Sequence, residues 1–140
     1  MLVIFIPKPG IDLYRTFLES ETSRMILRFY PPQRRAGGVV EVAVATLGSG
    51  LSLASELRWY IRRYTSDLLF QTGDGVLLSQ KLAREIYDRQ LGYPGAEWEH
   101  RYLCTISDDE TSHDLTVFCS QAEIKKEAGS GKHRSDGCHL

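Results

Sequence analysis

Basic and aromatic side chains form the first group of residues whose types could do chemistry. Arginine guanidinium groups pair with phosphates and an exposed indole can stack on a base, a combination that suits single-stranded nucleic acid. The candidate nucleic-acid-binding residues lie in two stretches of the chain and are Lys8, Arg28, Arg34, Arg35, Trp59, Arg62 and Arg63. The alternative for the same residues is a solvated surface or a protein contact, since arginine is mostly exposed in folded proteins.

A run of acidic residues near the C-terminal end could hold a divalent cation through oxygen ligands. Its carboxylates are Asp108, Asp109, Glu110 and Asp114, with His113 beside them and His100 at the other end of the same segment. A metal-dependent enzyme acting on phosphoryl or phosphodiester groups would need such a cluster. The spacing matches no calcium-binding loop, however, and a solvated hairpin tip is the alternative. We therefore expect no catalytic residue, no metal site and no cofactor.

Cysteine and histidine residues give a weaker metal-binding pattern. Cys104 and Cys119 would face one another across a hairpin centred near Thr111, but they lack Cys-x-x-Cys spacing and are expected to be buried. A second set, His133, Cys138 and His139, lies in a polar segment in which nothing preorganises the ligands. Neither set predicts a metal site.

Length and composition predict one folded domain. The chain has 140 residues, of which 42% are hydrophobic and 25% charged, and these values exclude disordered and disulfide-dense classes. We expect the domain to span residues 1–124 and a flexible polar segment to span 125–140. No apolar run is long enough for a membrane helix, and residues 2–6 lack the flanks of a signal peptide. The expected location is intracellular, cytoplasmic or nuclear, without a membrane partner.

Charge is distributed unevenly along the chain. Residues 1–64 carry nine Lys or Arg against five Asp or Glu, a net charge of +4, whereas residues 65–140 carry eight against thirteen, a net charge of −5. The acidic half could meet a basic protein while the basic half contacts another copy or another chain. This is the basis of a second hypothesis, a protein-interaction or regulatory subunit.

Hydrophobic periodicity predicts alternating strands and helices in residues 1–46. Residues 2–6 are expected to form a central strand buried on both faces, and residues 11–21 an amphipathic helix. Residues 25–30 alternate loosely and predict an edge strand, followed by a loop over 31–38. Residues 39–46 are the clearest strand, with Val40, Val42 and Val44 pointing one way.

A second helix follows the Leu47-Gly48 turn, with Ser49 or Ser52 as its N-cap. Its buried stripe is expected to comprise Leu53, Leu57, Tyr60, Ile61 and Tyr64, which leaves Ser55, Trp59, Arg62 and Arg63 outside. Residues 68–70 predict a strand and 72–75 a turn. Ser79 is expected to cap a third helix, with Leu82, Ile86 and Leu91 inward and Gly92 at its end. Residues 101–106 and 115–120 predict a hairpin.

This order, β-α-β-β-α-β, predicts an α+β fold with a two-layer ferredoxin-like core and an added C-terminal helix and β-hairpin. We expect the inward-facing residues of three elements to form one core cluster, which comprises Val42, Val44, Leu57, Ile61 and Leu69.

The run from Val42 to Leu51, followed by an amphipathic helix, resembles the strand, glycine turn and second helix of Alba-type nucleic-acid-binding domains. The resemblance covers residues 39–80 and 113–121 and rests on the Leu47-Gly48 turn and the order of elements. The helix at 79–91 and the absence of a basic excess depart from that pattern, so we assign no membership.

These observations favour a non-catalytic binding module whose partner is RNA or another single-stranded nucleic acid. The competing hypotheses are a protein-interaction or regulatory subunit, including a homo-oligomer, and, behind both, the metal-dependent enzyme. Salt separates the first two, because phosphate binding weakens steeply with salt.

Overall fold

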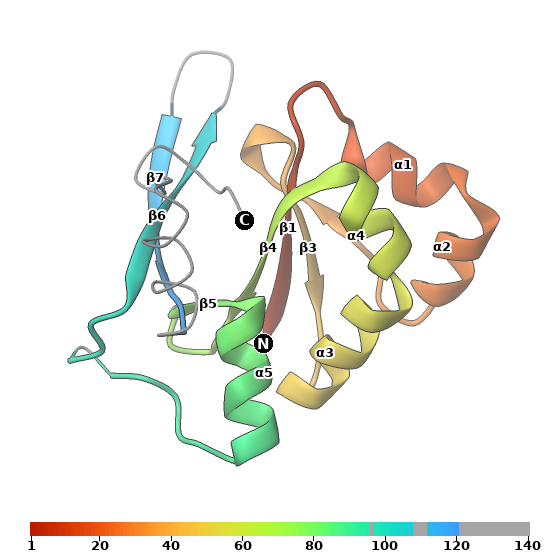
Figure 1. Cartoon of the computed structure of the whole chain (residues 1–140). Helices are drawn as coiled ribbons and strands as arrows, with labels where there is room; N and C mark the ends of the chain where they lie inside the picture. Colours follow the sequence, from red (N-terminus) through yellow and green to blue (C-terminus); the bar gives the residue numbers. More distant parts are fainter. Residues whose placement is uncertain (96, 108–111, 121–140) are drawn as a thin grey trace.

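The fold is built on one β-sheet, shown in the computed structural model of Figure 1, which describes residues 1–95, 97–107 and 112–120. In this part of the chain the sheet has seven strands in the order β2-β3-β1-β4-β5-β7-β6. All neighbouring strands are antiparallel except β5 and β7. The strands are β1 (Leu2–Pro7), β2 (Gln33–Arg34), β3 (Val40–Ala43), β4 (Thr65–Gln71), β5 (Leu77–Ser79), β6 (Arg101–Ser107) and β7 (Ser112–Phe118).

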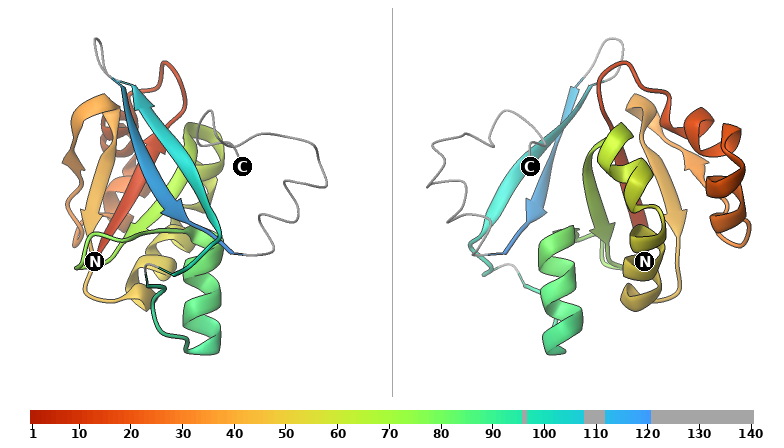
Figure 2. Two further views of the ribbon diagram at one scale, coloured as in Figure 1. Left: turned by 90° about the vertical axis from the view of Figure 1, so that its left-hand side faces the viewer. Right: turned by 45° about the vertical axis from the view of Figure 1, so that its right-hand side comes forward.

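Helices cover one face of this sheet (Figures 1 and 2). They are α1 (Leu13–Glu19), α2 (Glu21–Ile26), α3 (Leu47–Glu56), α4 (Arg58–Tyr64) and α5 (Gln80–Arg89), with a short 3-10 turn, η1, at Ala36–Gly38. Among the residues described, no helix combines the length and apolarity needed to cross a membrane.

Apolar side chains between the helices and the sheet form the larger of two core clusters, which we call the helical-side core. Its fully buried members include Val3, Phe5, Phe17, Val42, Leu57, Phe70 and Leu78. Gly50 allows α3 to approach the sheet closely, because a Cβ at this position would lie 3.1 Å from both Phe70 and Val3. The helices therefore pack directly on β1 and β4.

The β6–β7 hairpin covers the opposite face of the same strands (Figure 2). The second cluster, the hairpin-side core, comprises Ile4, Ile6, Val39, Leu69, Leu77, Tyr102, Cys104, Val117 and Cys119. Successive residues of a strand point to opposite faces, so β1 supplies Val3 and Phe5 to one core and Ile4 and Ile6 to the other. This confirms the prediction that β1 is a central strand buried on both faces.

The predicted core is confirmed except at Leu69. Val42, Val44 and Leu57 are buried in the helical-side core, and Ile61 packs against it. Leu69 instead belongs to the hairpin-side core, and its neighbours Leu68 and Phe70 face the helices. An apolar run buried on both faces does not reveal which of its residues faces the helices.

The predicted edge strand at 25–30 is wrong. Ser20 has an extended conformation that ends α1, and the chain then forms α2. The Ser23 hydroxyl group donates to the carbonyls of Phe17 and Ser20, and Leu27 N donates to Ser23 O at 2.9 Å. Ser23 and Leu27, four residues apart, are both buried, which is helical spacing. The strand at the edge of the sheet beside β3 is β2, which lies inside the segment predicted to be a loop.

The predicted ends of two helices also differ from the structure. Leu47 and Gly48 belong to α3, whose N-cap is Thr46 rather than Ser49 or Ser52, and the Thr46 hydroxyl accepts from Ser49 N at 3.1 Å. Ser79 caps α5 as predicted, but that helix ends at Arg89, and its C-cap residue Gln90 takes a left-handed conformation with φ of 54°. Leu91 therefore lies outside the helix, and it is 49% exposed rather than buried.

The α+β class is confirmed by the mixed sheet and its helices. The sheet nevertheless continues beyond β4 through β5 to a parallel neighbour, β7, and β5 was not predicted from the sequence pattern. This strand order is more complex than that of the simple two-layer arrangement predicted from the sequence.

Candidate functional site

Helix α4 is oriented by contacts on one of its sides. Leu57, which joins α3 to α4, is fully buried, and Tyr60 is 8% exposed. The Tyr60 ring lies with its centroid 6.2 Å from that of Phe17, and its hydroxyl oxygen is 2.5 Å from Ser20 Oγ. These contacts with α1 and the residue that follows it fix which side of α4 faces the core.

The opposite side of α4 carries basic and aromatic side chains. Trp59, Arg62 and Arg63 are three and four residues apart, so they share one helix face, and all three are exposed as predicted. Arg58 is exposed as well, one turn before Arg62. Three arginines and a tryptophan therefore lie on a helix of seven residues.

Trp59 is held in place while much of its surface stays accessible. Its ring makes edge contacts with Tyr60 and Tyr64, at centroid distances of 5.0 and 6.1 Å. The Arg63 guanidinium carbon lies 4.7 Å from the centroid of the Trp59 ring, a cation–π geometry. Trp59 nevertheless remains 56% exposed, so more than half of its surface is open to solvent.

Lys8 joins this group from the loop between β1 and α1. Its Nζ donates to the carbonyl oxygen of Arg62 at 3.1 Å, and its backbone N donates to that of Tyr64 at 2.9 Å. The carbonyl end of a helix favours a cation, which explains why the loop docks there. We call the group Lys8, Arg58, Trp59, Arg62 and Arg63 the α4 basic face. Within the described residues its four cations form no ion pair with a carboxylate.

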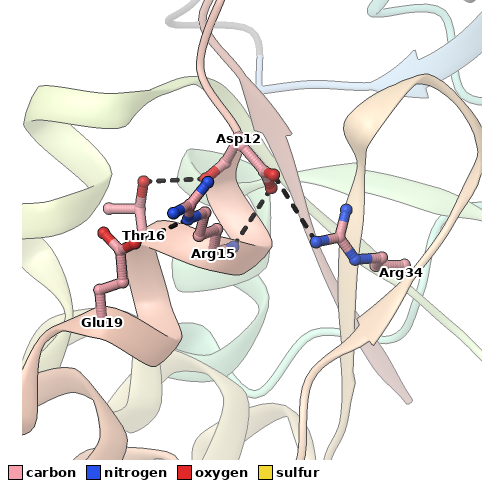
Figure 3. A network of polar contacts seen from close by, with 5 residues as sticks. All are labelled: Asp12, Arg15, Thr16, Glu19 and Arg34. Carbon is pink, nitrogen blue, oxygen red and sulfur yellow. Dashed lines mark hydrogen bonds and ion pairs between the residues drawn. The ribbon is translucent and has the colours of Figure 1, made fainter.

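The two arginines of the β2–β3 hairpin are paired instead. Arg34 lies 3.6 Å from the Asp12 carboxylate and stacks over Tyr14, with its guanidinium carbon 4.5 Å from the ring centroid. Figure 3 shows that Asp12 also caps α1, where it accepts from Arg15 N. Arg35 lies 3.1 Å from the Glu41 carboxylate. Each arginine of the hairpin therefore lies within ion-pair distance of a carboxylate of the same chain.

Arg28 is separate from the other predicted site residues. Its guanidinium carbon lies 4.7 Å from the Phe29 ring centroid, and it lines a cavity along α3 that reaches from Gly48 to Glu56. Lys8 instead docks at the end of α4, which Figure 1 places at the opposite end of the helical layer from the beginning of α3. Of the seven predicted residues, the structure thus brings together Lys8, Trp59, Arg62 and Arg63.

Among the described residues, the acidic side chains predicted near the C-terminal end form no metal-binding cluster. Asp108, Asp109 and Glu110 lie outside the described residues, and Asp114 accepts a hydrogen bond from the Thr105 hydroxyl at 2.7 Å. The ring of His100 lies against Trp98 instead. In the segments that the structure describes, no group of three or more His, Cys, Asp or Glu could hold a metal ion.

The predicted cysteine arrangement is wrong within the hairpin. Cys104 lies opposite Leu115, and Arg101 lies opposite Phe118, so Cys104 and Cys119 do not face one another. Both cysteines are buried in the hairpin-side core, as expected. His133, Cys138 and His139 lie outside the described residues.

Sequence reasoning missed Arg58 and a buried polar pair. Arg58 precedes Arg62 by four residues, a spacing that could have found it. Asp67 is 2% exposed and Tyr102 is 6% exposed, and the Tyr102 hydroxyl donates to Asp67 Oδ2. An aspartate directly before the apolar run Leu68–Phe70 was the available signal. This pair links β4 to β6 across the hairpin-side core.

Comparison with known proteins identifies a family that includes this chain. Residues 1–106 match a family of unknown function (DUF5804), and this segment includes the whole α4 basic face. No curated protein and no solved structure matches the chain significantly. Because the match covers more than half of its length, the chain belongs to DUF5804, a family of unknown function.

Proposed function

We propose that this chain is a non-catalytic module that binds single-stranded nucleic acid, preferably RNA, through the α4 basic face. The observation that carries the proposal is the exposed indole of Trp59 among cations without carboxylate partners in the described chain. Arginine and lysine would contact successive phosphates, and the indole would stack on a base regardless of sequence. The expected mode is electrostatic and sequence-tolerant.

The two faces of the sheet support the choice of a helical surface. Several RNA-binding domains stack bases on an open sheet face, but here the β6–β7 hairpin covers the face opposite the helices. Ile4, Ile6 and Leu69 are buried beneath that hairpin. A base could not reach them without displacing it, so α4 is the better candidate.

We also infer that β2-β3-β1-β4 and helices α1–α4 form a ferredoxin-like core to which the later elements were added. Its support is the antiparallel pairing of β1 with β3 and β4, and of β2 with β3. The helices then occupy the side opposite the hairpin, which leaves the outer surface of α4 uncovered.

The test is a fluorescence anisotropy titration of labelled oligouridine with the wild-type chain and two double variants at several salt concentrations. Arg62→Ala/Arg63→Ala should lower the affinity by at least about tenfold at low salt. It should also reduce the slope of log K against log salt concentration by about one to two, because fewer counterions are released on binding. Arg34→Ala/Arg35→Ala is the matched control and should change the affinity less than about threefold, because both arginines are paired internally.

Three outcomes would contradict this proposal. Wild-type protein that fails to bind at low salt would remove nucleic acid and favour the protein-interaction alternative. Equal losses in the two double variants would show that the α4 basic face has no special role. Tighter binding of oligodeoxyuridine than of oligouridine would contradict the preference for RNA, because only RNA carries the 2′-hydroxyl.

A further inference from the structure

Exposed apolar side chains gather beside α3. The described part of the chain exposes eight large hydrophobic side chains, and five of them line two cavities that border this helix. These five are Met25, Phe29, Tyr87, Leu91 and Tyr93. Isolated apolar residues on a surface are ordinary, whereas a contiguous group with a polar rim marks a contact surface.

The two cavities adjoin and form one groove. The first lies between the beginning of α3 and the end of α5, with Leu91 and Tyr93 in its wall. The second lies between α3, from Gly48 to Glu56, and the segment that contains Met25 and Phe29. Gly48, Ser49 and Tyr87 border both cavities, so we call the whole the α3 groove.

Tyr87 and Gly48 shape the middle of the α3 groove. A Cβ on residue 48 would lie 2.8 Å from Cε1 of Tyr87, closer than real side chains come. Glycine therefore lets the Tyr87 ring lie directly on the first turn of α3. The phenol divides the groove into two parts that a protruding side chain could enter from either end.

Charged side chains lie on both sides of the centre of the α3 groove. Arg28 lies in the wall of the Phe29 part, which also contains the exposed Glu56, and Asp88 lies in the wall of the Leu91 part. The Arg28 and Asp88 side chains are both exposed. Neither forms an ion pair within the residues that the structure describes. The groove thus offers a cation and a carboxylate on opposite sides of its centre.

We propose that the α3 groove is the contact surface of a symmetric homodimer. A two-fold axis near Tyr87 would place Phe29, which is 73% exposed, into the cavity beside Leu91 and Tyr93 of the second copy. The same rotation brings Arg28 opposite Asp88 of the second copy. An isologous contact requires one surface to carry both complementary features, and the α3 groove carries a protruding ring, a receiving cavity and both charges.

The test is sedimentation velocity over a concentration series of the full chain. Wild-type protein should show a reversible monomer–dimer equilibrium. Phe29→Ser should raise the dimer dissociation constant at least about tenfold, because central aromatic anchors dominate interfaces of this kind. Leu18→Ser, which alters an exposed residue of α1 outside the groove, is the matched control and should leave the dissociation constant unchanged.

Charge reversal tests the predicted pairing of the two copies. Arg28→Glu and Asp88→Lys should each weaken the dimer, and the variant that combines them should recover the wild-type dissociation constant. Circular dichroism checks that every variant is folded, which is expected because these side chains are exposed.

The proposal is overturned if wild-type protein is monomeric throughout the concentration series. Binding of the groove to a different protein would not rescue it, because the proposed occupant is a second copy of this chain. A Phe29→Ser dimer of unchanged affinity would exclude this surface. Charge-reversal variants that weaken the dimer singly without recovery in combination would exclude the two-fold geometry.

Discussion

The two faces of the sheet are covered in different ways. On the helical side, aromatic and aliphatic side chains from several helices fill the space against β1, β3 and β4. On the other side, one hairpin covers the sheet and joins it through a two-residue parallel ladder, Leu77 with Val117 and Leu78 with Phe118. That side also contains the buried pair of Asp67 and Tyr102.

This difference separates two physical roles. Apolar packing is not directional, so many arrangements of helices could bury the same area. A hydrogen bond between a buried carboxylate and a tyrosine hydroxyl requires one position of the hairpin over the sheet. We infer that the helical-side core supplies most of the stability and that the Asp67–Tyr102 pair specifies where the hairpin lies.

The largest expected effect belongs to the helical side. Leu57→Ala should lower the free energy of unfolding by about 2–5 kcal/mol, because Leu57 is fully buried and its truncation leaves a cavity. Urea unfolding followed by circular dichroism measures this loss. Leu103→Ala, on the exposed side of β6, is the control and should cost less than about 0.5 kcal/mol. Equal effects would contradict the assigned orientation of Leu57.

A smaller effect is expected from the polar pair on the hairpin side. Asp67→Ala should cost about 1–3 kcal/mol, since it leaves the buried Tyr102 hydroxyl and the Leu68 amide without this acceptor. Amide hydrogen exchange should quicken in β6 and β7 and remain slow in β1 and β4.

Tyr102→Phe is the companion variant, because it removes the hydroxyl group and keeps the ring. It should quicken exchange in the same two strands. Uniform acceleration across the whole sheet in both variants would show that the pair does not act locally, and would remove the distinction between the two faces.

Sequence patterns predicted the elements whose periodicity is strong. The alternation of Val40, Val42 and Val44 and the stripe that includes Leu57 and Tyr60 indicated correctly which side chains are buried. The patterns failed where tertiary contacts decide. Strand β5 has three residues and depends on pairing with β4. Helix α2 begins directly after α1 ends, and there the Ser23 hydroxyl donates to the Phe17 carbonyl of the preceding helix. No local pattern encodes either contact.

The candidate site was predictable within one helix and not between elements. The spacing of Trp59, Arg62 and Arg63 fixes a common face once the helix is known. The sequence did not show which cations have carboxylate partners. The partner of Arg34 is the N-cap residue of α1, and the partner of Arg35 lies in β3. The contact of Lys8 with Arg62 spans 54 residues and depends on the complete fold.

The smallest expected effect belongs to the solvent-exposed side of α4, the helix that also carries Tyr60. Arg62→Ala/Arg63→Ala should change the free energy of unfolding by less than about 0.5 kcal/mol, because both side chains are exposed and form no ion pair in the described chain. The Lys8 contact survives, since its acceptor is the Arg62 backbone carbonyl. Urea unfolding under the conditions used for Leu57→Ala measures the change. A loss as large as that of Asp67→Ala would mean that these arginines support the fold, and weaker RNA binding by the double variant would then no longer locate the binding surface.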